Sequence, residues 1–278
     1  MSSPLSRKSK SNQVFRKASL AVLAIGLGAV CFHLSSSITI WRAAQEETHV
    51  TPFLLEVKSY TFEDNPEGEL LNVRREARRS EGTKVVSGAV FGQVGLQAGE
   101  TARKITYMDG RTVTLADSIA AKTTWPQRST LQVAQMKSML LNAPTNCVYP
   151  GETLLGYATV LGQHVAIVKQ RPLPGVDDEE STSWRAPALA CQELEYRVVA
   201  KQPDGSQKVL TRGKAVTLEL GEPDPSLFDE RTNYAEVKPS DMLRQLASRL
   251  GVTWDDHQKA SAKIMDDIYL KGFATVTQ

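Results

Sequence analysis

Residues 105–115, ITYMDGRTVTL, carry the clearest β-hairpin signal in the chain. Ile105 and Tyr107 are two positions apart on one side of an Asp-Gly pair, and Val113 and Leu115 are two apart on the other side. Side chains two apart lie on the same face of a strand, so each arm has one apolar face. An acidic residue followed by glycine between two such arms is typical of a tight antiparallel connection.

The register of this hairpin follows from matching the two apolar faces. A two-residue loop would pair Ile105 with Thr114 and place an apolar side chain opposite a polar one. A three-residue loop, Met108–Gly110, pairs Ile105 with Val113 instead, and Gly110 then takes the left-handed conformation that such a loop requires. We therefore predict the three-residue loop.

Similar β-prone segments, separated by turn residues, recur along the chain at short spacing. Strands at this spacing with few helices favour an antiparallel sheet over βαβ units. The sequence therefore predicts a mainly β (α+β) fold. The segments are 53–62, 70–79, 84–90, 151–168, 184–200 and 208–220.

Helices are predicted at two places. Ser129–Leu141 has helix-tolerant composition and is followed by Pro144. Near the C-terminus, leucines at 243, 246 and 250 form one apolar stripe, and Gly251 after them is a typical C-terminal cap. Thr253 with Asp256 resembles a capping box and predicts a second helix that ends near residue 272. We assign 46–239 to a β-rich domain and 240–278 to a C-terminal helical extension.

The N-terminus has the pattern of a segment that enters or crosses a membrane. Residues 1–18 form a basic tail without acidic residues, and 19–41 include the uncharged run Leu20–Leu34. Read as a signal peptide, this run is followed by small residues for a peptidase. Read as an anchor, 19–41 would span about 34 Å as a helix, with Trp41 at the interface. Under both interpretations the protein belongs to the bacterial cell envelope, with its main domain on the periplasmic side and the membrane as a partner.

The overall charge of the chain depends on that basic tail. The formal net charge is +2, but without the tail the acidic residues slightly outnumber the basic ones. A domain of that sign lacks the basic surface that nucleic acids require, so no nucleic-acid partner is expected. Its 41% hydrophobic and 23% charged residues are typical of a globular domain.

The chain has three cysteines, and they differ in their sequence context. Cys31 lies in the apolar segment, which leaves Cys147 and Cys191 as a pair in an oxidising compartment. Such a pair favours one structural disulfide over two buried thiols. His164 is the one histidine between them, and no spacing typical of a metal site occurs, so neither a metal nor a cofactor is expected.

The run from residue 222 to 228, EPDPSLF, resembles the closing motif of a group of uncharacterised bacterial envelope proteins, in which a tyrosine follows, as Tyr234 does here. Trp184, Pro187 and Leu189 are similar to the Trp-x-x-Pro-x-Leu strand of that group. The resemblance implies the curved half-barrel of lipoprotein-carrier (LolA-like) proteins over about residues 50–240. This chain differs at Glu230 and Arg231, where the group has an aliphatic residue and a proline.

No residue pattern commits the chain to catalysis. His164 lacks a neighbouring acid and nucleophile, and no nucleophile elbow, kinase or zinc-protease signature occurs. The glycines at 88, 92, 95 and 99 lack the context of a phosphate loop. The arginines at 74, 75, 78 and 79 fit either a self-paired surface cluster or contact with anionic headgroups. The acidic run 177–180 fits a solvated loop.

Four aromatic residues are candidates for the ligand-facing side of the sheet, although core packing explains them equally well: Tyr107, Trp125, Tyr157 and Trp184. Two functions follow. The first is a non-enzymatic domain that binds an apolar or lipidated ligand, a lipid or a lipoprotein, on its curved sheet. The second is a membrane-tethered interaction or sensor module for another envelope protein. An open apolar pocket on the concave face favours the first, and a face filled by the protein's own side chains favours the second.

Overall fold

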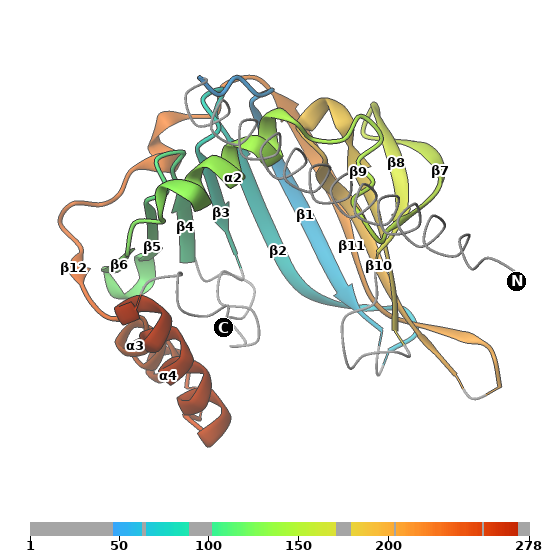
Figure 1. Cartoon of the computed structure of the whole chain (residues 1–278). Helices are drawn as coiled ribbons and strands as arrows, with labels where there is room; N and C mark the ends of the chain where they lie inside the picture. The colour runs from blue at the N-terminus through green and yellow to red at the C-terminus, as the bar shows by residue number, and fades with distance from the viewer. Residues whose placement is uncertain are drawn as a thin grey trace, which may run out of the picture.

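The computed structural model describes residues 47–62, 65–88, 102–170, 179–202, 204–251 and 253–271. Over these ranges the chain forms one open, twelve-stranded sheet in the order β12-β6-β5-β4-β3-β2-β1-β11-β10-β9-β8-β7 (Figure 1). Neighbouring strands are antiparallel except for β12 and β6, which are parallel. The prediction of a mainly β, antiparallel fold with a few helices and a C-terminal helical pair is confirmed.

The strands are β1 (Phe53–Thr61), β2 (Glu69–Arg78), β3 (Lys84–Ser87), β4 (Ala102–Thr106), β5 (Thr112–Ala116), β6 (Ala121–Trp125), β7 (Thr153–Val160), β8 (Gln163–Lys169), β9 (Glu179–Ala186), β10 (Gln192–Lys201), β11 (Gln207–Leu220) and β12 (Ala235–Glu236). The helices are α2 (Thr130–Leu141), α3 (Pro239–Leu250) and α4 (Asp256–Lys271), with short 3-10 turns η1 (Asp117–Ile119), η2 (Pro187–Leu189) and η3 (Pro225–Phe228).

The hairpin of β4 and β5 has the predicted register. Ile105 pairs with Val113. The Tyr107 N–H donates to the Arg111 carbonyl at 2.9 Å, which closes a loop of three residues. Gly110 has a φ of +90°, in the region that favours glycine. The three-residue loop is therefore confirmed.

The sheet curls toward one face. Phe53 and Leu55 of β1 pack in one buried cluster with Val165 of β8, although β11, β10 and β9 lie between these strands. Ala215, Leu194 and Ala186 from the strands between them belong to the same cluster, so this apolar surface is continuous across one face of the sheet. We call this the inner face, and Figure 1 shows the bend.

The register identifies which side chains share each face. Directly paired residues point the same way, and Phe53–Arg78–Lys84–Thr106 forms a paired row across β1 to β4. This row therefore lies on the inner face. The alternate row, Leu54–Ala77–Val85–Ile105–Val113, lies on the opposite, outer face.

The chain after β11 covers part of the outer face. Phe228 of η3 packs against Ala77, Val85 and Ile105 in a second buried cluster. Tyr234 donates to Asp117 at 2.9 Å. Glu230, where the resembled group has an apolar residue, pairs with Arg111, so this segment docks through a charge pair.

Two of the helices have a typical capping residue at one end. Ser129 and Gln132 form a reciprocal capping box at the start of α2, and Gly251 caps α3 with a φ of +67°. Met242 and Leu246 of α3 are buried against Ala116 and Ala121. α4 begins at Asp256 rather than Thr253. Within the described ranges, no helix is both long and apolar enough to cross a bilayer, and the predicted segment 19–41 lies outside them.

The predicted β-prone segment 184–200 is divided between two strands. β9 ends at Ala186, the turn η2 follows, and β10 begins at Gln192. Between these two strands, Ala190 has a φ of 52° and Cys191 a φ of 60°. Cys191 is joined to Cys147, with the two Cα atoms 5.4 Å apart, so the predicted disulfide is confirmed.

Candidate functional site

The candidate site is a pocket of about 520 Å³ between α2 and the inner face of β2 to β4. α2 crosses in front of these strands (Figure 1). Of the twelve residues of this helix, only Ala134 is buried. α2 therefore covers the sheet without filling the space beneath it, and the space is larger than a few water molecules, at about 30 Å³ each.

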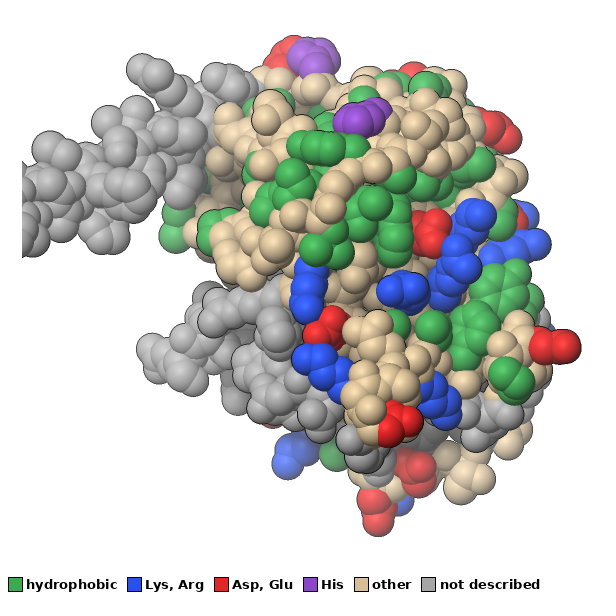
Figure 2. All heavy atoms as spheres, turned by 90° about the vertical axis from the view of Figure 1, so that its right-hand side faces the viewer, with side chains coloured by type: hydrophobic (Ala, Val, Ile, Leu, Met, Phe, Trp, Pro, Cys, Tyr) green, Lys and Arg blue, Asp and Glu red, His purple; other side chains and the backbone are tan. Residues whose placement is uncertain are grey.

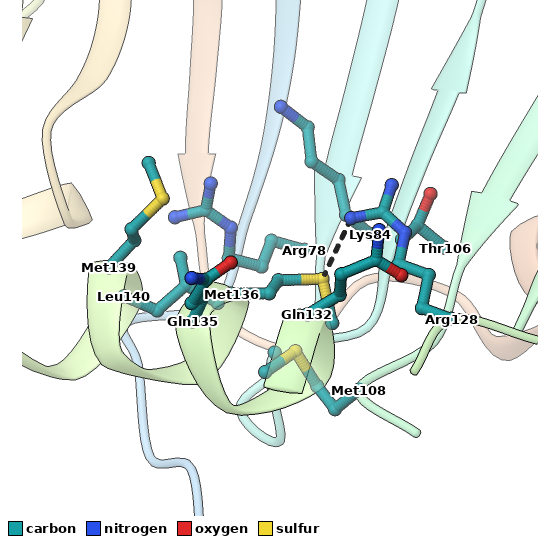
Figure 3. A pocket seen from close by; sticks show the side chains of 11 residues that line it. Arg78, Lys84, Thr106, Met108, Arg128, Gln132, Gln135, Met136, Met139 and Leu140 are labelled. Carbon is teal, nitrogen blue, oxygen red and sulfur yellow. Dashed lines mark hydrogen bonds between the residues drawn. The ribbon is translucent and has the colours of Figure 1, made fainter. Parts of the chain in front are cut away.

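The helical side of the pocket is mainly apolar. Gln132, Gln135, Met136, Met139 and Leu140 line it and recur at helical spacing, so they share one face of α2. Met108, from the β4–β5 loop, adds a further thioether (Figure 3). Methionine side chains are flexible and polarisable, which suits a surface that accommodates apolar groups of varied shape.

The sheet side of the pocket is cationic. Arg78 of β2 and Lys84 of β3 lie on the inner face, and Arg128, just before α2, reaches over the same space (Figure 3). Arg128 Nη1 lies 3.9 Å from the sulfur of Met136. Thr106 is the neutral lining residue that β4 contributes. The pocket thus has one apolar wall and one positively charged wall.

The carboxylate of Glu76 contacts two of the surrounding cations. Its side chain is only 4% exposed, and it contacts Lys84 Nζ and lies 2.8 Å from Arg74 Nε. Gln192 donates to the same carboxylate at 3.1 Å. Burial by itself would raise the pKa of Glu76, but Lys84 and Arg74 outweigh that effect and hold the pKa below its ordinary value. Glu76 is therefore a carboxylate under this pocket.

Arg78 is the most deeply buried of the cations that line the pocket, with 6% of its surface exposed. It donates to the Leu189 carbonyl at 3.0 Å and to the Gln192 side chain at 3.3 Å. Its guanidinium lies 5.0 Å from the centre of the Phe53 ring. These hydrogen-bond acceptors are neutral, and the buried Nε has no hydrogen-bond partner among the described residues.

Lys104 adds positive charge on the same face of the sheet. It pairs with Val86 and Thr114. Burial, and to a lesser extent the charge of Arg128, hold the pKa of Lys104 below its ordinary value. Lys104 is therefore a mostly buried cation on the inner face, with Arg128 as a further cation nearby.

The four aromatic residues predicted for the ligand face do not come together. Tyr107 packs on the outer cluster under the Arg111 guanidinium, at 4.1 Å. Trp125 donates to Thr114 and contacts Tyr269 of α4 edge to face. Tyr157 is 52% exposed on β7, and Trp184 packs against the inner cluster. None of the four lines the pocket under α2.

The remaining candidates from the sequence form no reactive cluster. His164 is exposed on β8 and stacks on Tyr157, with ring centres 5.0 Å apart. Among the described residues, no three His, Cys, Asp or Glu side chains are grouped to hold a metal. The glycines at 92, 95 and 99 and the acids at 177 and 178 lie outside the described ranges.

The pocket residues were only partly recognisable from the sequence. The arginine cluster was noticed, and strand alternation separates it: Arg74 and Arg78 point to the inner face, whereas Arg75 pairs with Glu56 and Arg79 with Glu81. The contribution of Gln192 was missed, because it lies 116 residues from Glu76 along the chain. Its only signal was its position after the Trp-x-x-Pro-x-Leu strand.

No protein-family description and no curated protein matches the sequence significantly. Solved structures do match. A chain of the Pseudomonas aeruginosa MucA/MucB complex is 15% identical, with a TM-score of 0.40, over 72% of this chain and 62% of that one. The LolA superfamily protein NE2245 from Nitrosomonas europaea is 9% identical, with a TM-score of 0.27, over 68% and 96%. LprF from Mycobacterium bovis is 10% identical, with a TM-score of 0.28, over 67% and 93%.

These matches include the LolA superfamily, which the closing motif of the sequence resembles. This chain spans less than two thirds of the length of the MucA/MucB chain that it matches. At these TM-scores the matches are distant.

Proposed function

We propose that this protein is a non-enzymatic binding domain of the cell envelope that holds an apolar or lipidated ligand between α2 and the inner face of its sheet. The observation that carries the proposal is the pocket of about 520 Å³, with its wall of methionine and leucine side chains. Ligand pockets typically have volumes of about 300–1,000 Å³ and mainly apolar walls with a few polar groups.

The loose packing of α2 supports the same function. Met139 lines the pocket and is 63% exposed, so one end of the space is open to solvent. Exposing a large apolar side chain next to an unfilled cavity forgoes stabilisation of about 25 cal/mol per Å². A ligand that covers Met139 and the neighbouring Leu140 would recover that stabilisation.

The disulfide and the N-terminal sequence both support a compartment outside the cytosol. A disulfide between Cys147 and Cys191 is stable in an oxidising space, such as the periplasm, and rare in the cytosol. The basic residues 1–18 and the apolar residues 19–41 would deliver the domain to that space, as a signal peptide or as an anchor.

The test is lipid analysis of the full chain purified from its native envelope, with Met136→Trp as the blocking variant. Met136 lines the pocket, and a larger ring there would fill it. Leu131→Trp is the matched control, because Leu131 lies on the same helix, is 58% exposed and does not line the pocket. We expect co-purifying lipid in the wild type and in Leu131→Trp, and its loss in Met136→Trp. Equal lipid in all three, or none in any, would contradict the proposal.

A second candidate function is docking of a protein at the β7 edge of the sheet. Leu155, Tyr157 and Leu161 are 56%, 52% and 43% exposed there, and Figure 2 shows apolar side chains gathered on this side of the molecule. β7 ends the strand order, and an edge strand offers backbone groups to an added strand. Cross-linking from position 157 in the envelope tests this function, and a reproducible protein adduct would support it.

A further inference from the structure

We infer that the ligand of the pocket under α2 is an anionic amphiphile, whose phosphate or carboxylate group is bound by Arg78, Lys84 and Arg128. This inference rests on the proposed function and specifies its ligand class. It starts from Arg78, a cation that lines the pocket and is only 6% exposed. Its side-chain hydrogen bonds go to neutral acceptors, the Leu189 carbonyl and the Gln192 side chain.

The charges around the pocket leave a surplus of cations. Glu76 is in contact with both Lys84 and Arg74. The hydrogen-bond acceptors of Arg78 are neutral, and Lys104 is a further cation on this face, near Arg128. Two carboxylates, Glu76 and Glu193, act on the three cations Arg74, Arg78 and Lys84, and Lys104 is a fourth cation on this face, so the cations outnumber the carboxylates. An anion supplied by the ligand would balance this surplus.

The arrangement of the two walls fits a molecule with a charged head and an apolar tail. The cations Arg78 and Lys84 line the sheet side of the space, and Met136, Met139 and Leu140 line the helix side (Figure 3). A head group that faces the sheet would therefore leave its tail against these side chains of α2. Guanidinium groups bind phosphate and carboxylate with paired hydrogen bonds, so both anions share this chemistry.

The experiment compares probes that differ only in the head group. Dodecyl phosphate, dodecanoate and dodecanol are titrated by calorimetry into the full chain in phosphatidylcholine nanodiscs, with empty discs subtracted, and inorganic phosphate is titrated alone. We expect dodecyl phosphate or dodecanoate to bind at least about 10-fold more tightly than dodecanol, because hydrogen bonds to charged groups are worth about 1.5–3 kcal/mol. The tighter of the two anions identifies the head group.

Variants connect this selectivity to the pocket. Arg128→Gln and the conservative Arg78→Lys should each lower the preference for the anionic probe by about 10-fold. Arg197→Gln is the control, because Arg197 is exposed on β10 and lines a different pocket. If the Arg78→Lys variant does not fold, the Arg128→Gln variant still tests whether the pocket is selective for the anionic probe.

The outcomes separate this inference from the function on which it rests. Equal binding of dodecanol and the two anions would overturn the inference and leave the proposed function standing. No binding of any alkyl probe would overturn both. Loss of selectivity in Arg197→Gln as well would show a general charge effect and would also overturn the inference. Inorganic phosphate binding as tightly as dodecyl phosphate would show that the tail is not recognised.

Discussion

Glu76 lies below the pocket and contacts Lys84, Arg74 and Gln192. Burying an ion pair is weakly stabilising at best, because both charges lose their hydration. Removing one partner is costly, since the other charge stays buried without compensation. The three groups therefore depend on one carboxylate, which also keeps Lys84 in place at the wall of the pocket.

Glu76→Gln should lower the free energy of unfolding by about 3–5 kcal/mol, because it leaves buried cations without a counter-charge. Urea denaturation measures this change. Glu56→Gln is the control, since its partner Arg75 is largely exposed and such pairs contribute less than about 1 kcal/mol. Equal losses in the two variants would show that the buried network has no special importance.

The same residue should make stability depend on pH. The pKa of Glu76 in the folded protein lies below its ordinary value of 4.5, so its contribution is fully present above that pH and is lost as the pH falls through the folded pKa. The free energy of unfolding should decrease from about pH 6 to about pH 3, and less steeply in Glu76→Gln. Parallel pH profiles for the two proteins would contradict this assignment.

Gly110 combines a positive φ with a close approach of α2. A Cβ atom there would lie 2.6 Å from Cγ2 of Val133, in the first turns of the helix. Gly110→Ala should therefore destabilise the protein by more than about 1 kcal/mol, through both backbone strain and the clash. Gly162→Ala is the matched control, with a φ of +76° and no atom within 4 Å of the added Cβ. Thermal unfolding should show a larger loss of stability for Gly110→Ala than for Gly162→Ala. A larger loss for Gly162→Ala would refute the close approach of Val133 to Gly110.

α2 is held at its two ends rather than along its length. Before it, Gln127 donates to the Asp109 carbonyl at 3.1 Å. After it, the chain reaches Cys147, which is joined to Cys191, and Arg185 donates to the Cys147 carbonyl at 3.0 Å.

The disulfide should matter more for α2 than for the sheet. Replacing Cys147 and Cys191 together by alanine should cost about 4 kcal/mol in the chain-entropy account, which is model-dependent. Hydrogen exchange should increase in α2 more than in β1. The reduced wild type is the control, because it removes the bond without changing the side chains. Uniform loss of protection would show that the bond stabilises the sheet as a whole.

Local patterns predicted the elements better than the site. The register of the β4–β5 hairpin followed from the match of Ile105 with Val113, and α2 followed from helix-tolerant composition before Pro144, because both depend on neighbours in sequence. The break at η2 was missed, since consecutive positive φ values at Ala190 and Cys191 have no glycine to mark them. The pocket is formed by elements that lie far apart in sequence, and no local sequence pattern indicates that they meet.

Across the whole molecule, the curled sheet separates two kinds of surface. Part of the outer face is covered by the chain's own residues, with Phe228 and Tyr234 packed on it. The inner face buries its own apolar cluster near β8, but under α2 it combines cations with an unfilled apolar space. Binding on the inner face and structural closure on the outer face is the division of roles that we propose.

Hydrogen exchange of the full chain in neutral nanodiscs, with and without dodecyl phosphate, tests the central claim most directly, because it reports where a ligand is held. Binding under α2 predicts new protection in residues 130–141 and in β2 to β4, and little change in β7. Protection confined to the β7 edge, or no change anywhere in the chain, would contradict the claim that the space under α2 is the binding site.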